Sequence, residues 1–356
     1  MLSKDGHLVY VITLAEERNY RSLLDSNIVY DYIIHDSRRK SLIRYFLRAL
    51  NFMRRKHVGN LLLRKLNRID ADVAFTFNEF EKCLIPLSKS NAHMKICWFR
   101  HDISDYHQCE RIIKEDRELF KNLFMQMDQL LFVTHQSMDN YIDIFPEFKD
   151  RCSYLLNSID IGKINELSKE NSIARPEDKV VFSCVARLSY EKGQDMLYEA
   201  AGYLDKNGYQ GKYEIWLIGD YTDKKYVINP KGIETTNIRR LGRKDNPYPY
   251  MKQADVLICS SRSEGCPNVI LEAMALGIPI ISTRTSGGVE LLGNGSYGIL
   301  CDINSRSIAD AMVEMLNENT RLHYSEIAEE RGNYYSNEVF LSRINTILNK
   351  QTVRGK

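Results

Sequence analysis

The sequence contains no Cys-x-x-Cys pair, although it has eight cysteines. Neither the ligand spacing of a structural zinc site nor the cysteine framework of a small secreted domain is therefore visible. Reduced thiols, as in a cytosolic protein, are the expectation.

A long hydrophobic run is also missing. The apolar run from Leu8 to Leu14 is followed at once by Glu16, Glu17 and Arg18, and it is far shorter than the roughly 20 residues of a membrane span. It is also too short for a signal peptide. We therefore expect a cytoplasmic protein without a transmembrane segment.

The chain as a whole has no excess of charge of one sign. Its formal net charge is +2, with 44% hydrophobic and 27% charged residues. This composition is typical of a soluble globular protein and excludes bulk attraction to polyanions such as nucleic acid. Because 356 residues exceed what one hydrophobic core usually serves, two domains are expected.

Short apolar and β-branched runs alternate with helical patterns, which indicates parallel sheets with helices on both faces. The predicted strands are 8–14, 73–77, 95–99, 129–134, 180–185, 215–218, 256–259 and 278–282. A mostly polar stretch in the middle of the chain indicates the domain junction. The predicted division is an N-terminal domain at 1–162, a linker at 163–178, a second domain at 179–336, and a C-terminal helix at 337–356 that crosses back to the first domain.

One segment does carry charge of a single sign. From Arg38 to Arg68 there are eleven Lys or Arg residues and no Asp or Glu. On a helical wheel, Arg44, Arg48 and Arg55 lie opposite an apolar face, as in a basic amphipathic helix on an anionic membrane surface. That face consists of Leu42, Phe46, Leu50 and Met53. An ordinary packed helix is the alternative, and nucleic acid is a weaker one because no aromatic stacking platform accompanies the charge.

The stretch from Ser260 to Pro279 is the most informative in the chain. It follows a predicted strand directly, and Pro267 and Gly277 suit the first turn and the C-terminal cap of a helix. Glu264 then lies in a loop and Glu272 on the helix. Because Glu272 is the one charged residue in an apolar helix, its carboxylate needs hydrogen-bond donors, which the hydroxyls of a ribose would supply.

The turn into this helix presents the residues Gly265, Cys266, Pro267 and Asn268. Backbone amides at the positive end of a helix dipole are suited to sugar hydroxyls or phosphate oxygens, although a proline has no donor to offer. The alternative is that Glu264 caps the helix and Glu272 reaches solvent.

A second predicted strand, 180–185, ends in a loop that carries Arg187 and Lys192. Ligands of open α/β sheets bind at the carboxyl ends of the strands, so these cations are expected to face the same site as the carboxylates. They would neutralise a diphosphate, whose negative charge grows as it departs. Alternatively, they are surface cations that pair with Glu191 or Asp195.

In order and spacing, five motifs of the C-terminal half resemble the family 4 retaining glycosyltransferases of the GT-B fold. They are Ala186-Arg187-Leu188 with Lys192-Gly193, Trp216 to Asp220, Arg240-Leu241-Gly242, the pair Glu264 and Glu272, and Ser286 to Glu290. A weaker likeness is found in the N-terminal half in Lys95 to Asp102, Leu131 to Ser137 and Leu155 to Asp160. The resemblance implies an α/β protein of two Rossmann-like domains whose parallel sheets face an interdomain cleft.

Carried over residue by residue, the resemblance also implies the roles of a donor site. Arg187 and Lys192 would bind the donor diphosphate, and Glu272 the ribose. Glu264, with the loop 265–268, would bind the transferred sugar. The nucleobase would lie near the residues Leu241, Gly242 and Arg243.

His101 matches a position where the family often places a histidine against the donor sugar, and we expect it to act in catalysis together with Glu264. An imidazole can donate a hydrogen bond or move a proton near neutral pH. One alternative is a metal cluster with Asp102, Asp105 and His107, but the spacing of a catalytic zinc site is absent. Another is a loop histidine without a role. We expect neither a metal nor any other cofactor.

The chain departs from the family in one respect, because no Gly-Gly pair precedes Gly287-Gly288. The usual first strand and glycine loop are therefore expected to be missing.

The resemblance implies transfer of a sugar from a nucleoside diphosphate sugar to an acceptor hydroxyl, with retained configuration. The basic segment indicates a lipid-linked or cell-surface polysaccharide acceptor, and peripheral association with the inner face of the membrane. The alternative is a truncated, inactive relative that binds nucleotide or partners without transfer.

Overall fold

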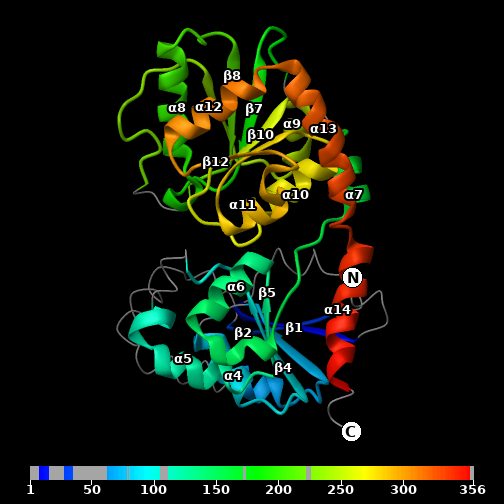
Figure 1. Ribbon diagram of the computed structural model, residues 1–356. Helices are drawn as coiled ribbons and strands as arrows, with labels where there is room; N and C mark the ends of the chain where they lie inside the picture. Colours follow the sequence, from blue (N-terminus) through cyan, green and yellow to red (C-terminus); the bar gives the residue numbers. More distant parts are fainter. Residues whose placement is uncertain are drawn as a thin grey trace. The chain divides into compact units, whose positions relative to one another are not determined.

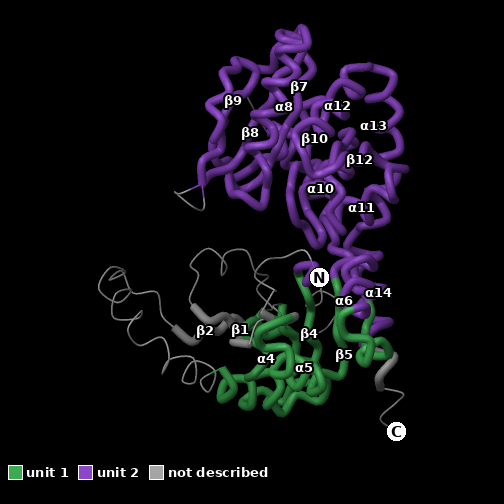
Figure 2. Tube along the Cα trace, turned by 60° about the vertical axis from the view of Figure 1, so that its left-hand side comes forward, with its two compact units in different colours: residues 1–100, 108–132, 144–153 green, residues 101–107, 133–143, 154–356 purple. Residues whose placement is uncertain are grey.

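The computed structural model forms two compact units, shown in different colours in Figure 2. The first comprises 1–100, 108–132 and 144–153, and the second 101–107, 133–143 and 154–356. The structure describes residues 8–15, 28–34, 62–77, 79, 81–104, 111–170, 174–221 and 226–352. Arg44, Arg48 and Arg55, and the helix predicted around them, lie outside the described residues.

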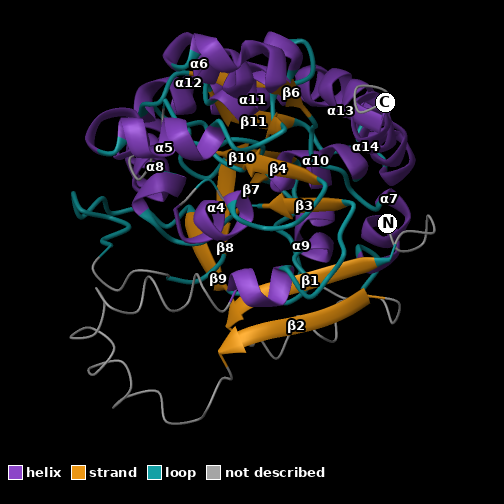
Figure 3. Cartoon of the chain, turned by 90° about the horizontal axis from the view of Figure 1, so that it is seen from below, coloured by secondary structure: helices purple, strands orange, loops and turns teal. Residues whose placement is uncertain are grey.

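The first unit contains two sets of paired strands. β1 (Val9–Ala15) and β2 (Ile28–Ile34) pair in parallel, side by side in Figure 3. The other set is a four-stranded sheet in the order β3-β4-β5-β6, in which β4 is parallel to both β3 and β5. Its strands are β3 (Val73–Thr76), β4 (Met94–Phe99), β5 (Gln129–Phe132) and β6 (Cys152–Tyr154).

Phenylalanines fill the core of this unit. Phe99 of β4 and Phe132 of β5 stack with ring centroids 4.6 Å apart. Phe124 meets the rings of Phe145 and Phe148 edge to face, at 6.0 and 6.2 Å, an arrangement that aromatic rings favour. The helical segments of this unit are α4 (Glu81–Ser88), the π-helical turn η2 (Arg111–Glu115), α5 (Arg117–Phe124) and the 3-10 helix η3 (Pro146–Arg151). The helix α6 (His135–Ile144), which lies between α5 and η3 in the sequence, belongs almost entirely to the second unit.

The second unit is built on a six-stranded parallel sheet in the order β12-β11-β10-β7-β8-β9. Its strands are β7 (Val180–Val185), β8 (Tyr213–Ile218), β9 (Ile238–Gly242), β10 (Val256–Cys259), β11 (Ile280–Thr283) and β12 (Ile299–Cys301). After β7 the chain adds strands first on one side and then on the other, so the order reverses between β7 and β10. In open α/β sheets, ligands bind beyond the carboxyl ends of the strands at such a switch point.

Helices cover both faces of this sheet (Figure 1). On one face, α8 and α12 pack against alternate strand residues such as Phe182 and Ile258, and on the other α10 and α13 pack against Leu257 and Ile280. This alternation explains why the central strands are apolar throughout. The helical segments are α7 (Ile161–Leu167), η4 (Tyr190–Lys192), α8 (Gln194–Lys206), α9 (Tyr248–Gln253), α10 (Asn268–Ala275), α11 (Ser286–Leu291), η5 (Gly293–Gly295), α12 (Ser305–Met315), α13 (Glu318–Asn333) and α14 (Asn337–Thr352).

The predicted strands are confirmed, with small shifts at their ends. The sequence did not predict β2, β6, β9 and β12. β9 was not predicted because it is an edge strand in which the exposed Arg239 and Arg240 interrupt the apolar run. Charged residues of this kind are usual on sheet edges. β6 and β12 span three residues each, too few to show a pattern.

The predicted linker 163–178 begins inside a helix. The Asp160 side chain caps α7 by accepting a hydrogen bond from the Lys163 amide at 2.9 Å, and Ile164 is buried against the α10 side of the second unit. Asn165 donates to the carbonyl of Ala275 at 3.5 Å. The start of this segment therefore belongs to the packed second unit. Within the described part of the chain, no helix combines the length and the apolarity that crossing a bilayer requires.

Asp205 connects three segments of the second unit. Its carboxylate accepts hydrogen bonds from Tyr213 at 2.8 Å, Thr235 at 2.7 Å and Asn237 at 2.7 Å.

Asp205→Ala leaves the buried Asn237 amide without this acceptor, so we expect the free energy of unfolding to fall by about 2 to 3 kcal/mol in urea denaturation. Asp310→Ala is the control, because the Arg306–Asp310 pair is exposed and its loss is expected to cost below about 1 kcal/mol. Equal effects of the two substitutions would contradict the prediction.

Candidate active site

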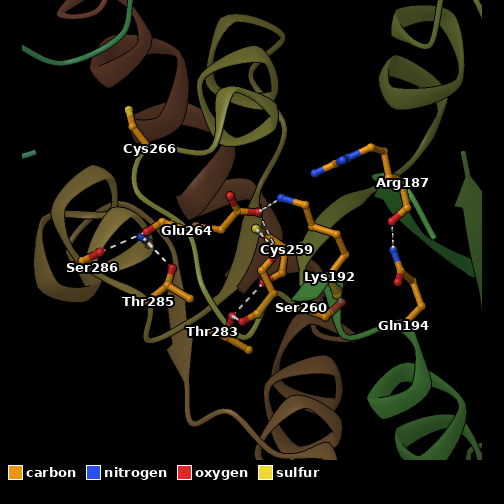
Figure 4. Close-up of polar contacts among 12 residues, drawn as sticks. Arg187, Lys192, Gln194, Cys259, Ser260, Glu264, Cys266, Thr283, Thr285 and Ser286 are labelled. Atoms are coloured by element: carbon orange, nitrogen blue, oxygen red, sulfur yellow. Dashed lines mark hydrogen bonds and ion pairs between the residues drawn. The ribbon is translucent and has the colours of Figure 1, made fainter. Parts of the chain in front are cut away.

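Two loops meet at the switch point of the second sheet. One follows β7 and carries Arg187, the short helix η4 and Gly193; the other runs from β10 to α10 and carries Glu264. Figure 4 shows the polar contacts between them. Because β7 and β10 are neighbouring strands, the two loops lie together, as the sequence predicts, and their role as a binding site stays a prediction.

Lys192 and Glu264 form an ion pair across the two loops. The Nζ to Oε1 distance is 2.5 Å, and the side chains are only 19% and 14% exposed. Ser261 Oγ donates to the same carboxylate oxygen at 2.7 Å. The alternative in which Lys192 pairs with Asp195 is wrong, because Asp195 pairs with Arg262. The alternative in which Glu264 caps α10 is also wrong, because this helix has no side-chain cap.

Arg187 lies on the same loop but is exposed. Its carbonyl accepts a hydrogen bond from Gln194 Nε2 at 2.9 Å, which fixes the backbone, whereas the guanidinium makes no hydrogen bond or ion pair with any residue the structure describes. In Figure 4 the Arg187 side chain extends toward the Lys192 ammonium. The Arg187 and Lys192 side chains thus extend toward the same place, and among the described residues the guanidinium N–H groups of Arg187 remain available to a ligand.

The backbone of the Glu264 loop packs closely against the first residues of α11. The Glu264 carbonyl accepts hydrogen bonds from the Gly287 amide and from Ser286 Oγ, both at 3.0 Å. A Cβ at Gly287 would lie 2.6 Å from Pro267 Cδ and 2.7 Å from the Gly265 carbonyl oxygen. The glycine is needed here for close approach, and it holds the Glu264 loop against α11.

The turn into α10 is built as the sequence indicated, shifted by one residue. Pro267 precedes the helix in an extended conformation, and the helix begins at Asn268. Gly265 and Pro267 are buried, Cys266 is half-buried and Asn268 is exposed. Asn157 Nδ2 donates to the Cys266 carbonyl at 3.2 Å and to Asn268 Oδ1 at 2.7 Å. Sequence reasoning gave Asn157 no role, because its partners lie more than a hundred residues away.

Glu272 sits half-buried on α10 and accepts a hydrogen bond from the Tyr248 hydroxyl at 3.3 Å. Burial raises the pKa of Glu272, and the Tyr248 hydrogen bond opposes this only in part. Burial, together with the nearby Glu272 charge, raises the pKa of Tyr248 to about 12. The raised pKa of Glu272 therefore reflects the expected cost of burying a charged carboxylate on an apolar helix. Tyr248 is a hydrogen-bond donor to this carboxylate that the sequence did not predict.

The predicted nucleobase segment lies at the carboxyl end of β9. Leu241 packs against Val181, Trp216 and Ala254, as part of a small apolar cluster. Gly242 and Arg243 are exposed, and Arg243 lies 3.6 Å from Asp245. Gly242 and Arg243 are therefore accessible to solvent, although the Gly242 carbonyl accepts a hydrogen bond from the Gly219 amide at 3.0 Å.

His101 follows β4 and is half-buried. Its neighbour Asp102 accepts hydrogen bonds from Ser104 Oγ at 2.6 Å and from Asn140 Nδ2 at 2.7 Å, so its carboxylate shapes the turn. Asp105 and His107 lie outside the described residues. Among the residues described, no group of three or more metal-ligating side chains occurs. The catalytic role of His101 stays a prediction.

The raised pKa of Glu272 predicts a pH-dependent gain in stability on its replacement. Because the folded state holds this proton more tightly than the unfolded state, the free energy of unfolding falls as pH rises from the ordinary glutamate pKa through the raised one. Glu272→Gln removes that loss. We expect the variant to be more stable than the parent protein at pH 7, with the difference vanishing below about pH 4. Urea denaturation at both pH values measures it.

Glu326→Gln, on an exposed position of α13, is the matched control and should leave stability unchanged at both pH values. A Glu272→Gln variant whose stability differs from that of the parent by the same amount at pH 4 and pH 7 would contradict the assignment of a buried charge.

Comparison with known proteins relates part of this chain to a described family. A family model described as glycosyl transferases group 1 matches residues 179–318. An uncharacterized glycosyltransferase of Methanocaldococcus jannaschii is 24% identical over 69% of this chain and 69% of its own length.

Two further curated relatives are named for their reactions. The lipopolysaccharide core biosynthesis glycosyltransferase LpsE of Rhizobium meliloti is 30% identical over 41% of this chain and 42% of its own length. The N-acetylgalactosamine-N,N'-diacetylbacillosaminyl-diphospho-undecaprenol 4-alpha-N-acetylgalactosaminyltransferase of Campylobacter jejuni is 26% identical over 60% of this chain and 58% of its own length. The chain therefore spans about half the length of these two relatives.

Solved structures share the fold over nearly the whole chain. Anabaena HepE in complex with UDP has a TM-score of 0.72 at 16% identity, covering 96% of this chain and 92% of its own. A Rickettsia africae glycosyltransferase has a TM-score of 0.72 at 15% identity, covering 98% and 91%. Residues 179–318 therefore match the group 1 glycosyltransferases, and the chain shares the GT-B fold of these solved structures.

Proposed function

We propose that this protein transfers a sugar from a nucleoside diphosphate sugar to an acceptor hydroxyl, with the anomeric configuration retained. The observation that carries the proposal is the convergence of Arg187 and the Lys192–Glu264 ion pair at the switch point of a parallel sheet. A diphosphate is the ligand whose charge these cations match, and the HepE structure holds UDP.

The two cations stabilise the departing diphosphate. Glu264 occupies one donor of the Lys192 ammonium, which leaves two of its three N–H groups for phosphate oxygens. Arg187 supplies further donors. Because negative charge grows on the diphosphate as the glycosidic bond breaks, these contacts strengthen in the transition state and lower the barrier.

The remaining residues bind the rest of the donor. Glu272 accepts hydrogen bonds from the ribose hydroxyls, and the segment Leu241 to Arg243 lies beside the nucleobase. Glu264 and the loop 265–268 orient the transferred sugar, and His101 donates a hydrogen bond to it. The support for the ribose role is that burial desolvates Glu272, whose carboxylate accepts a hydrogen bond from the Tyr248 hydroxyl among the described residues, and such a carboxylate gains from further donors.

Retention follows from attack on the same face that the diphosphate leaves. The C–O bond to the diphosphate breaks, the acceptor oxygen forms the new C–O bond, and the acceptor proton passes to the departing phosphate oxygen. No protein nucleophile is needed. The Glu264 carboxylate, already engaged by Lys192 and Ser261, is placed to orient the sugar. The reaction is proposed to need no metal, since the cationic side chains supply the positive charge.

The acceptor is proposed to be a lipid-linked or glycan intermediate of a cell-surface polysaccharide. The named substrate of the Campylobacter relative is a diphospho-undecaprenol, and the Rhizobium relative acts in lipopolysaccharide core biosynthesis. The basic segment from Arg38 to Arg68 would hold the protein at the inner face of the membrane, because anionic lipids attract such segments.

Removal of either cation tests the diphosphate assignment. Arg187→Ala and Lys192→Ala should each lower turnover at least about tenfold, since a charge-assisted hydrogen bond is worth about 1.5 to 3 kcal/mol. The donor for this assay comes from a thermal-shift screen of UDP-, GDP- and ADP-sugars. Lys231→Ala, which removes an exposed lysine paired with Glu199, is the control. Full activity of both site variants would refute the assignment, and tight nucleotide binding by the parent protein with neither transfer nor donor hydrolysis would favour an inactive relative.

Charge reversal tests the membrane proposal. The triple variant Arg44→Glu, Arg48→Glu and Arg55→Glu should abolish sedimentation with anionic vesicles, since each basic residue near such a surface contributes about 1 kcal/mol. Vesicles of phosphatidylcholine alone serve as the control, and donor hydrolysis by the variant should be unchanged. Undiminished binding of the variant to anionic vesicles would overturn the assignment.

A further inference from the structure

We propose that Arg262 is a positioning residue, which forms with Asp195 a clamp that holds η4 in place and thereby aims Lys192 at the diphosphate. This inference rests on the proposed function of Lys192 and goes beyond it, because Arg262 belongs to none of the motifs that carry the family resemblance. The clamp is defined here as the side chains of Arg262 and Asp195.

The clamp is a bidentate ion pair between the two loops of the site. Arg262 Nη1 and Nη2 donate to Asp195 Oδ1 and Oδ2 at 2.9 and 2.7 Å, and the side chains are 22% and 13% exposed. Tyr226 adds a hydrogen bond to Asp195 at 3.0 Å. A paired, shielded fork of this kind fixes orientation as well as distance.

The clamp reaches η4 along its backbone. Arg262 Nη1 donates to the Tyr190 carbonyl at 2.6 Å, and the Arg262 amide donates to the Glu191 carbonyl at 2.7 Å. Ser260 Oγ donates to the Lys192 carbonyl at 2.8 Å. Every carbonyl of this three-residue helix therefore accepts a hydrogen bond from the loop after β10. The Arg262 guanidinium also lies 4.0 Å above the Tyr190 ring, as in a cation–π contact.

Gly193, which directly follows η4, packs closely against the loop after β10. Gly193 has φ +67°, and a Cβ on it would lie 2.1 Å from the Ser260 carbonyl oxygen. Backbone therefore packs directly on backbone, and η4 keeps its place only while the loop after β10 keeps its own. Since η4 is a single turn, it has little helical stability of its own to resist displacement.

Arg262 acts on the reaction through Lys192. Its guanidinium is already bound by Asp195 and by the Tyr190 carbonyl. We therefore do not expect it to contact the ligand directly. What it controls is the position of the Lys192 backbone, from which the ammonium reaches Glu264. A shift of about 1 Å in such a group is enough to lower a rate strongly.

The test compares the affinities of a nucleoside diphosphate and its nucleoside by calorimetry. Arg262→Ala and Asp195→Asn are measured with UDP and uridine, with GDP and guanosine, and with ADP and adenosine, and the tightest pair is used. We expect each variant to weaken diphosphate binding about tenfold while nucleoside binding stays within about twofold, because only the diphosphate meets Lys192. Arg262→Lys, which keeps the charge but loses the fork, should be intermediate.

Arg306→Ala is the matched control. Arg306 also pairs with an aspartate, Asp310 at 3.1 Å, and lies 4.0 Å above a tyrosine ring, Tyr203, but it sits on α12. The control should leave both affinities unchanged. Asp195→Asn keeps the shape of the side chain, so it reports on the clamp even if Arg262→Ala fails to fold.

The outcomes separate this inference from the proposed function. If Arg262→Ala and Asp195→Asn leave the ratio of diphosphate to nucleoside affinity at the parent value, the clamp does not position Lys192 and the inference is overturned. If Lys192→Ala itself leaves that ratio unchanged, the diphosphate role of Lys192 fails, and the clamp has nothing to aim.

Discussion

The ion pair between Lys192 and Glu264 joins the two loops that leave the second sheet on either side of its reversal in strand order. Both charges are largely shielded from water, and such charges persist in a protein only when they are paired and hydrogen-bonded. Ser261 satisfies part of the carboxylate, and the Glu264 carbonyl is held by Gly287. The loops are therefore rigid where the cation and the carboxylate meet, which is the condition for electrostatic preorganisation.

Close backbone contacts make this rigidity possible. At Gly193 and Gly287 the main chain approaches a second main chain so nearly that any side chain would collide with it. The parallel sheet brings the loops to one edge, and the glycines remove the remaining space between them. Charge, hydrogen bonding and sterics thus act on the same few residues, and each makes the others effective.

Much of this arrangement was visible in the sequence, because it depends on local patterns. The apolar runs predicted the central strands, and Pro267 and Gly277 bracketed α10 to within a residue. Arg262, Asn157 and Tyr248 were given no role because their partners are distant in the chain, and a lone arginine or tyrosine resembles any surface residue. β9 was missed because an edge strand with two arginines lacks the apolar run of a buried one. The roles of single residues toward a ligand depend on contacts that neither sequence nor fold supplies.

The fork between Arg262 and Asp195 links positions 67 residues apart. Loss of either partner alone would leave a shielded charge uncompensated, which is far more costly than loss of both. We therefore expect the two positions to covary in evolution, so that both charges are kept or both are replaced. Covariation of these two positions among homologous sequences would therefore report on the geometry of the two loops.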